Sequence, residues 1–175
     1  EWTVEATAID PNHYYGVTVG NGMVGLVSSP EPMKVRDVVL NGVYDYYQRG
    51  RVSNILKTFN HVNMNLDVDG GRVSQADILH YRQVLDMKRA VLTTTFDVKD
   101  KISVTHTLVA LRHLPYTALT RVDIKANKDV TITPMSVIEA PNHLVDVRNL
   151  FSQIDRPHVT IPLLTSVAKS PSGKH

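Results

Sequence analysis

A chain of 175 residues, 42% of them hydrophobic, is long enough for one soluble domain with a substantial core. Its 19 Lys and Arg residues against 17 Asp and Glu give a formal net charge of +2, and the basic residues are scattered singly, so neither nucleic acid nor a membrane surface is indicated as a partner. The absence of cysteine excludes disulfides, thiolate zinc sites and a cysteine nucleophile. No apolar run approaches the roughly eighteen residues of a membrane-spanning helix.

The two ends predict a piece of a longer protein. The chain begins at Glu1 without a charged-then-apolar leader, which suits a mature exported protein or an excised piece. The compartment stays open, with the periplasm or the extracellular space favoured over the cytoplasm. Residues 170–175 have the composition of a turn with no strand after it, so we expect residues 1–175 to be one amino-terminal domain cut from something larger.

A tight hairpin is predicted in residues 17–29. Two short β-branched runs flank Gly20-Asn21-Gly22, and Asn-Gly tolerates the positive φ angles that hairpin turns need. Gly25, inside the returning strand, marks a bulge or a close approach of two backbones. The spacing Gly20-x-Gly22-x-x-Gly25 also matches a dinucleotide-binding pattern, which we reject because strand rather than helix follows it.

Further along, an alternation of period two predicts half-buried strands. It is clean in residues 62–68, before the turn Asp69-Gly70-Gly71. A second hairpin is expected to join residues 91–98 to 102–111, with His106 on the same apolar face as Ile102. Residues 121–126 form another strand, and residues 130–138 return after a polar turn. With no strand–helix–strand alternation, this pattern indicates a mainly β, antiparallel sandwich.

Two short segments are helix candidates. In residues 52–59, Ile55, Leu56 and Phe59 have near-helical spacing, although no strong cap begins the segment. In residues 144–154, Leu144, Val147, Leu150 and Phe151 form one stripe.

No complete catalytic or metal-binding motif is present. The eight histidines contain no His-x-His or His-x-x-x-His pair, which leaves only a metal site assembled across strands open. We therefore predict no catalytic residue, no metal site and no cofactor in this chain. His106 is interpreted as a hydrogen-bonded core histidine.

Sugar hydrolysis uses two carboxylates placed across a glycosidic bond, and the candidate acids are Glu31, Asp37, Asp45, Asp86 and Glu139. Turn and surface roles are the simpler expectation for them. For Asp86, which lies between Leu85 and Met87, a structural hydrogen-bonding role is favoured over catalysis.

One aromatic group is a candidate for carbohydrate contact. The segment Asn41-Gly42-Val43-Tyr44-Asp45-Tyr46-Tyr47 combines a turn with three tyrosines and an acid. Tyrosine rings stack on the C–H faces of sugars, and a carboxylate accepts hydrogen bonds from hydroxyls. The candidates are Tyr44, Asp45, Tyr46 and Tyr47. The competing interpretation is that Tyr44 and Tyr46 pack inward as amphipathic core residues.

Several segments, in order, resemble glycoside hydrolase family 65, which includes maltose, trehalose and kojibiose phosphorylases and related hydrolases. The turn Asn21-Gly22-Met23-Val24-Gly25 resembles its Asn-Gly-(aromatic)-x-Gly signature, and Gly42-Val43-Tyr44-Asp45 its Gly-(Val/Ile)-Tyr-Asp segment. Residues 63–70 resemble its strand ending in a glycine turn, and residues 81–87 its Tyr-x-x-x-Leu-Asp-(Met/Leu) segment. The chain departs from the family at Met23, where an aromatic residue is usual, and at residues 27–29, where Arg-Gly is common.

The resemblance implies the amino-terminal domain of such an enzyme, a truncated part of an antiparallel β-supersandwich of the galactose mutarotase type. An (α/α)6 barrel would follow beyond residue 175 and would carry the general-acid glutamate and, in a phosphorylase, the site for inorganic phosphate as co-substrate. The expected function is a non-catalytic domain that packs on its own barrel and shapes the sugar site or a homodimer interface. A free-standing carbohydrate-binding module and an aldose epimerase-like protein are the alternatives.

Overall fold

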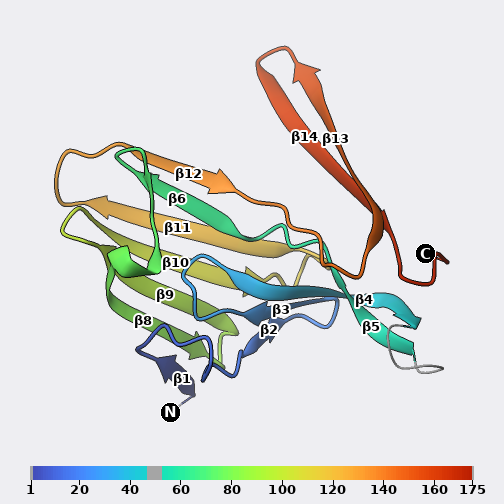
Figure 1. Cartoon of the computed structure of the whole chain (residues 1–175), viewed down its shortest axis with the longest axis horizontal. Helices are drawn as coiled ribbons and strands as arrows, with labels where there is room; N and C mark the ends of the chain where they lie inside the picture. Colours follow the sequence, from blue (N-terminus) through green and yellow to red (C-terminus); the bar gives the residue numbers. More distant parts are fainter. Residues whose placement is uncertain (1, 47–52, 175) are drawn as a thin grey trace.

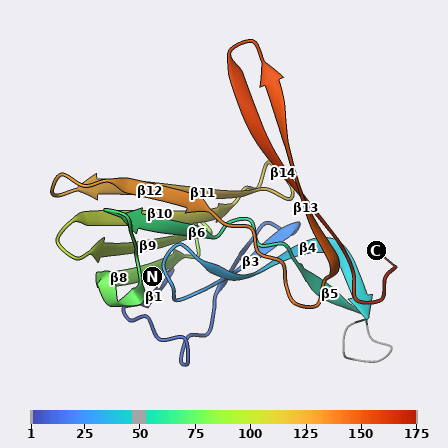
Figure 2. The ribbon, with the colours of Figure 1, turned by 45° about the horizontal axis from the view of Figure 1, so that its top comes forward.

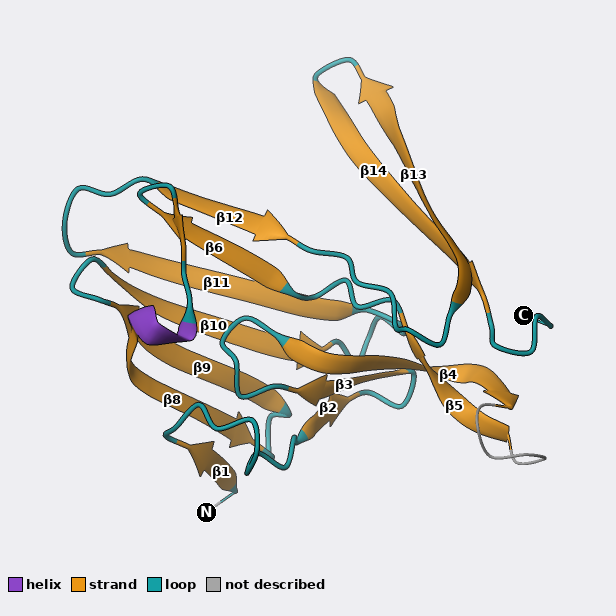
Figure 3. Cartoon of the chain, viewed as in Figure 1, coloured by secondary structure: helices purple, strands orange, loops and turns teal. Residues whose placement is uncertain are grey.

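The computed structural model describes residues 2–46 and 53–174, which form a mainly β structure of four antiparallel sheets (Figures 1 and 3). The five-stranded sheet has the order β1-β8-β9-β10-β11, with bounds Thr3–Ala6, Ile78–Asp86, Val91–Val98, Ile102–Ala110 and Ala118–Ala126. The four-stranded sheet has the order β2-β3-β4-β5, with bounds Thr18–Gly20, Val24–Ser28, Val35–Tyr46 and Ser53–Thr58. The three-stranded sheet has the order β12-β6-β7, with bounds Ile132–Ser136, Met64–Val68 and Gly71–Arg72. Strands β13 (Val145–Arg156) and β14 (Val159–Lys169) form a separate hairpin, and one 3-10 turn covers Gln75–Asp77.

The five-stranded sheet is one layer of the sandwich, and two smaller sheets share the other layer. One buried cluster joins its side chains to the four-stranded sheet: Val19, Val24, Leu26, Val35, Val38, Val62, Leu85, Leu92, Leu108 and Ala110. A second buried cluster joins it mainly to β6: Met33, Leu66, Val68, Phe96, Val98, Ile102 and Val104. The expected mainly β, antiparallel sandwich is therefore confirmed, with a core in two parts.

A row of polar side chains crosses the five-stranded sheet between the two clusters. Gln83, Thr94 and His106 lie opposite one another in register, and all three are buried. Gln83 donates from Nε2 to Thr94 Oγ1 at 3.1 Å and accepts from the Tyr14 hydroxyl at 2.5 Å. Burying a polar group costs little free energy only when the group is hydrogen-bonded. Gln83 and Thr94 meet this condition, whereas His106 Nε2 has no partner among the described residues.

The hairpin predicted in residues 17–29 is confirmed as β2 and β3. The Asn21 side-chain oxygen accepts hydrogen bonds from the backbone N–H groups of Met23 and Val24, both at 2.9 Å, and Gly22 has a φ of 90°. Gly25 lies opposite Gly20, and a Cβ added to Gly25 would lie 2.9 Å from a methyl of Val39 on β4. The tight contact at Gly25 is therefore with a side chain of β4, and neither of the two expected causes, a bulge or a close approach of two backbones, is shown there.

The other predicted strands are found, with one difference in pairing. The hairpin of β9 and β10 and the strand β11 match expectation, and His106 shares its buried face with Ile102. After β11, however, β12 does not pair with it. The chain crosses to the other layer, where β12 pairs with β6 over five residues, Ile132 opposite Val68 through Ser136 opposite Met64.

Both helix candidates are wrong. The described residues of segment 52–59 form β5, which pairs with β4, and segment 144–154 lies almost entirely in β13, which pairs with β14. In segment 144–154, the apolar spacing of three and four residues fits one stripe of a helix but does not require a helix. In β13, Leu150 and Phe151 are adjacent, so their side chains point to opposite faces of the strand. Pairing with the neighbouring strand of the chain decides the conformation in both cases.

Within residues 2–46 and 53–174, no helix is long and apolar enough to cross a membrane.

Candidate functional site

The tyrosine segment lies at the outer end of β4, beyond a bend. Residues 40–43 face a single residue of β5, since Val39 pairs with Lys57 and Tyr44 with Ile55, and Gly42 has a φ of 93°. Such a bulge bends a strand and re-aims its side chains. The last part of β4, with its partner β5, consequently extends past the edge of the sandwich (Figure 1).

Tyr44 and Tyr46 point to one side of this strand end and are 46% and 47% exposed. Because successive side chains of a strand point to opposite faces, Asp45 lies on the other side. Tyr44 is paired across the strands with the exposed Ile55, and its hydroxyl donates to Asn41 Oδ1 at 3.3 Å. The inward packing of Tyr44 and Tyr46 is therefore wrong. Tyr47 lies outside the described residues.

Asp45 is buried, with 3% of its surface exposed, and it holds the carboxy-terminal segment. One carboxylate oxygen accepts from the Ser172 backbone N–H at 2.9 Å and the other from the Tyr46 backbone N–H at 2.7 Å. Hydrogen bonds from the side chains of Ser170 and Ser172 lower the pKa of the Asp45 carboxyl well below its usual range. The structure thus separates Asp45 from the two exposed tyrosines, and carbohydrate contact by any of them remains a prediction.

A shallow depression of about 330 Å³ lies beside the exposed tyrosine face. The turn between β2 and β3 forms one wall through Gly22 and Met23, and Asn41 and Ile55 form another. Asn41 connects the walls: its backbone N–H donates to the Met23 carbonyl at 2.8 Å, and its own carbonyl accepts from the Tyr116 hydroxyl at 3.2 Å. Neither Tyr44 nor Tyr46 lines this depression; its link to the tyrosine face is the lining residue Ile55, which is paired with Tyr44.

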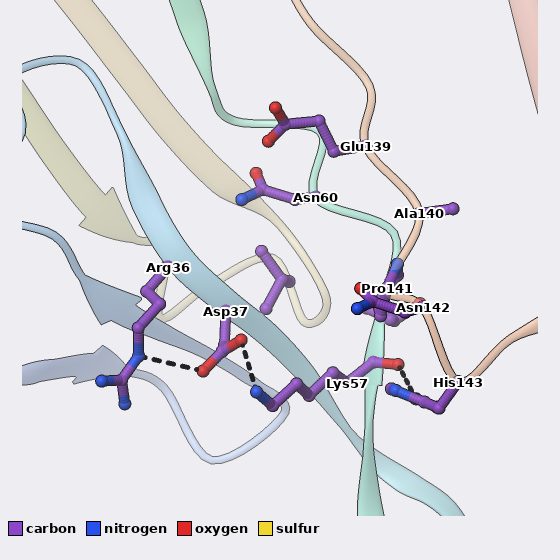
Figure 4. Close-up of a pocket in the computed structure, with 11 residues that line it drawn as sticks. Arg36, Asp37, Lys57, Asn60, Glu139, Ala140, Pro141, Asn142 and His143 are labelled. Carbon is purple, nitrogen blue, oxygen red and sulfur yellow. Dashed lines mark hydrogen bonds and ion pairs between the residues drawn. The ribbon is translucent and has the colours of Figure 1, made fainter.

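A second pocket, of about 310 Å³, lies between β4, β5 and the loop after β12 (Figure 4). Its lining is mostly polar: Arg36, Asp37, Val38, Lys57, Thr58, Asn60, Glu139, Ala140, Pro141, Asn142 and His143. Asp37 accepts from Arg36 Nε at 3.2 Å and from Lys57 Nζ at 2.9 Å, so a negative charge lies between two positive ones. His143 Nε2 lies 3.0 Å from the Lys57 carbonyl oxygen.

Two buried asparagines hold this pocket in place: Asn60 lines it, and Asn63 is bonded to the lining residue Glu139. Asn63 accepts from the Val35 backbone N–H at 2.7 Å and donates to Glu139 Oε2 at 2.6 Å. Asn60 donates to the Val35 carbonyl at 2.9 Å and exchanges two backbone hydrogen bonds with Glu139. These contacts fix the loop after β12 against the start of β4.

The five candidate acids are dispersed over the molecule. Asp37 and Glu139 line the same pocket, but the first is ion-paired and the second is bonded to Asn63. Asp86 accepts from the backbone and the guanidinium of Arg89, which confirms its structural hydrogen-bonding role and lowers its pKa. A general acid needs a raised rather than a lowered pKa, so Asp45 and Asp86 are poorly suited to protonate a leaving group. Glu31 is exposed and lines a separate depression.

His106 is buried as predicted, but its hydrogen bonding is incomplete. Its Nε2 has no partner among the described residues, and burial lowers its pKa to about 4. Within the described ranges, no group of three or more His, Asp or Glu side chains lies close enough together to hold a metal ion.

Comparison with known sequences identifies the chain. The profile of the amino-terminal domain of glycosyl hydrolase family 65 matches residues 16–170. The chain belongs to glycoside hydrolase family 65. This confirms the resemblance found in the motifs, from the Asn21-Gly22 turn to residues 81–87.

Relatives within family 65 are much longer than this chain. A kojibiose hydrolase of Mucilaginibacter mallensis is 49% identical over 173 residues, which is 99% of this chain and 26% of the relative. A kojibiose hydrolase of Flavobacterium johnsoniae is 46% identical over 173 residues, again 99% of this chain and 25% of the relative. The chain therefore spans about a quarter of the length of the curated relatives it matches.

The fold has a counterpart among the solved structures. A protein from the human microbiome, provisionally assigned as a kojibiose phosphorylase, superposes with a TM-score of 0.66 at 11% identity and covers 85% of this chain and 24% of that one. At this identity the likeness shows the shared fold, and it confirms a β-sandwich amino-terminal domain.

Sequence reasoning missed most of the polar pocket. Its residues come from three segments that are separate in the sequence. Charged residues that alternate with apolar ones in a strand are usually on the surface, so the pattern alone does not distinguish pocket residues from other surface residues. The one available signal was the pair Asn60 and Asn63 beside an apolar strand, because buried asparagines usually fasten backbone that lacks sheet partners.

Proposed function

We propose that this chain is the non-catalytic amino-terminal sandwich of an enzyme that cleaves α-linked glucosides, with kojibiose as the preferred substrate class. The observation that carries the proposal is the 49% and 46% identity, along 99% of the chain, to two kojibiose hydrolases. Hydrolysis is favoured over phosphorolysis because both of these relatives are hydrolases. The catalytic barrel and its acid would belong to the rest of the full-length protein.

The test is a product analysis with the full-length enzyme. Kojibiose is incubated with and without inorganic phosphate, and the products are separated by anion-exchange chromatography. We expect glucose alone, at a rate independent of phosphate. Glucose 1-phosphate that forms only with phosphate would show a phosphorylase instead, and no turnover of any α-linked glucose disaccharide would refute the proposal.

The isolated chain of residues 1–175 is expected to have no activity on α-linked disaccharides. The dispersed acids support this, since those described are ion-paired, hydrogen-bonded or exposed. Circular dichroism first shows that the isolated chain is folded. Turnover that a single Asp or Glu substitution abolishes would contradict the expectation.

A direct role in sugar contact is proposed for Tyr44 and Tyr46. Their exposure on one strand face, near the depression that Gly22 and Ile55 line, supports this role over a purely structural one. In the full-length enzyme, Tyr44→Ala and Tyr46→Ala should raise KM for kojibiose several-fold with little change in kcat, because uniform binding is lost. Tyr15→Ala is the matched control, since Tyr15 is 90% exposed and lines a different depression. Equal KM values in all three variants would leave these tyrosines without a role in the sugar site.

A further inference from the structure

The sequence contains two Asn-Gly pairs, Asn21-Gly22 and Asn41-Gly42, and the structure gives their side chains different surroundings. An Asn-Gly pair loses ammonia when the glycine nitrogen attacks the asparagine side-chain carbon, because glycine has no Cβ to hinder the approach. The side-chain amide must first turn toward that backbone nitrogen. Hydrogen bonds that fix the amide therefore decide which of the two pairs reacts.

The Asn21 amide is fixed at both of its polar atoms. Its Oδ1 accepts from the backbone N–H groups of Met23 and Val24, both at 2.9 Å, and its Nδ2 donates to the Leu111 carbonyl at 2.6 Å. The residue is half-buried. Turning this amide toward the Gly22 nitrogen would break these hydrogen bonds, each of which stabilises the fold. Asn21 is therefore held in an unreactive orientation.

The Asn41 amide has weaker contacts. Its Oδ1 accepts from the Tyr44 hydroxyl at 3.3 Å, which is long for a hydrogen bond between oxygens, and its Nδ2 lies 3.8 Å from the Met23 sulfur, a weak acceptor. The residue is exposed, so water reaches it. Gly42 lies in the bulge of β4 (Figure 2), outside the register with both neighbouring strands, and has a φ of 93°. This geometry leaves the amide room to turn toward the Gly42 nitrogen.

Two tyrosine hydroxyls contact the oxygen atoms of Asn41 on which negative charge would develop. The Tyr116 hydroxyl donates to the backbone carbonyl of Asn41 at 3.2 Å. That carbonyl belongs to the same peptide group as the Gly42 nitrogen, so it takes up charge when the nitrogen loses its proton. The Tyr44 hydroxyl donates to Oδ1, which takes up charge when the nitrogen attacks. Hydrogen-bond donors placed at developing negative charge accelerate a reaction.

We propose that Asn41 is a site of spontaneous deamidation, assisted by the hydroxyls of Tyr44 and Tyr116. Hydroxide removes the proton of the Gly42 nitrogen, and this nitrogen forms a bond to Cγ of Asn41. The bond from Cγ to Nδ2 then breaks, and ammonia leaves with a proton taken from water, which regenerates the hydroxide. The cyclic imide that remains adds water and opens to aspartate or isoaspartate. The net reaction consumes water and releases ammonia.

The modification would change the surface beside the depression that Gly22, Met23 and Ile55 line. Both products carry a negative charge where the amide was neutral. Isoaspartate also routes the main chain through the former side chain, so the carbonyl that Tyr116 contacts leaves the main chain. The contacts of Asn41 that connect β4 to the turn between β2 and β3 would then be altered.

Ageing of the folded full-length enzyme at mildly alkaline pH tests the proposal without any activity measurement. Trypsin cleaves after Lys34 and Arg36, which places Asn21 and Asn41 on separate peptides. Mass spectrometry follows deamidation at each site, and ageing in heavy-oxygen water distinguishes it from deamidation during digestion. We expect Asn41 to react at least ~10-fold faster than Asn21, because hydrogen bonds hold only the latter in place. In concentrated urea the two rates should become similar.

Tyrosine variants test the assistance by the hydroxyls. Tyr44→Phe and Tyr116→Phe each remove a hydroxyl and keep the ring, so each should slow deamidation of Asn41 several-fold. Tyr15→Phe is the matched control, since Tyr15 lines a different depression, and should leave the rate unchanged. Asn21 in the same samples reports on folding, because its rate rises in a variant that unfolds.

Two results would overturn the proposal. An Asn41 rate no greater than that of Asn21 in the folded enzyme would show that the structure does not single out Asn41. An unchanged Asn41 rate in folded Tyr44→Phe and Tyr116→Phe would show that the two hydroxyls give no assistance.

Discussion

Single buried polar residues set the limits within which this domain is stable. His106 is the clearest example, because it is buried, its Nε2 has no partner, and its pKa is lowered to about 4. Each unit of pKa difference between the folded and unfolded states corresponds to about 1.4 kcal/mol. The ordinary value for histidine is about 6.5.

Because the pKa of His106 is lower in the folded than in the unfolded state, acid should destabilise the fold. Since the unfolded state binds the proton more readily, stability is fully present above about pH 6.5 and is lost as the pH falls toward 4. We expect a loss of up to about 3 kcal/mol across that window. Urea unfolding of wild type and of the variant His106→Leu at pH 7 and pH 4.5 measures it. The variant should show a clearly smaller drop, and parallel curves for the two proteins would contradict the assignment.

Asn63 is the second residue on which the local structure depends. Asn63→Ala removes the acceptor for the Val35 N–H and the donor for Glu139. A buried group left without its partner costs about 1–3 kcal/mol, so we expect a loss of about 2 kcal/mol in the free energy of unfolding. Asn65→Ala is the control, because Asn65 is only half-buried and its side-chain oxygen accepts from the Lys34 ammonium instead of from a buried backbone group. Equal losses in the two variants would show that the buried network contributes little.

At the scale of elements, the turn between β2 and β3 depends on backbone geometry. Gly22 has a φ of 90°, so Gly22→Ala should cost about 1 kcal/mol through strain alone, since nothing would touch the added Cβ. Gly71→Ala is the matched control: its added Cβ would meet only ordinary contacts, and Gly71 does not have a positive φ. Thermal unfolding followed by circular dichroism compares the two, and a Gly71→Ala loss as large as that of Gly22→Ala would argue against the strain.

The root of the β13–β14 hairpin depends on Asp45. Asp45→Ala removes the acceptor for Ser170 and Ser172, so the end of β14 should open more often and trypsin should cleave after Lys169 several-fold faster. Asp123→Ala, which removes an exposed carboxylate bonded to Arg121, should leave this cleavage unchanged. If Asp45 instead serves only a sugar, its replacement would weaken sugar binding and leave proteolysis as it was.

The strands themselves were largely predictable, because alternation and turn residues are local signals. β9, β10 and β11 appear where Ile102 and its alternating neighbours place them, and the Gly20-Asn21-Gly22 turn has the expected form. The hairpin of β13 and β14 was missed although its strands are consecutive, because the apolar residues of segment 144–154 also fit a helical spacing. The crossing of β12 to β6 was not predictable, since these partners lie far apart in the chain and leave no local trace. The same holds for the site: the exposure of Tyr44 and the burial of Asp45 depend on a bulge and on Ser172, 127 residues away in the sequence.

At the scale of the whole molecule, the domain combines a fastened sandwich with an open hairpin. The curated relatives that it matches are about four times its length, and its open surfaces lie at the outer ends of β4, β5 and β13–β14 (Figure 2). Its described acids serve mainly as structural partners. This division is what the proposed non-catalytic role requires.

The polar row of Gln83, Thr94 and His106 has a consequence for how substitutions combine. Because it separates the two apolar clusters, damage in one should leave packing in the other unchanged. Leu108→Ala and Ile102→Ala lie on one strand but in different clusters, so their unfolding free energies should add to within about 0.5 kcal/mol. Leu108→Ala and Leu92→Ala face each other in one cluster and should deviate from additivity by more than that. The domain would then tolerate change in either half of its core independently, with a row of buried polar side chains as the boundary.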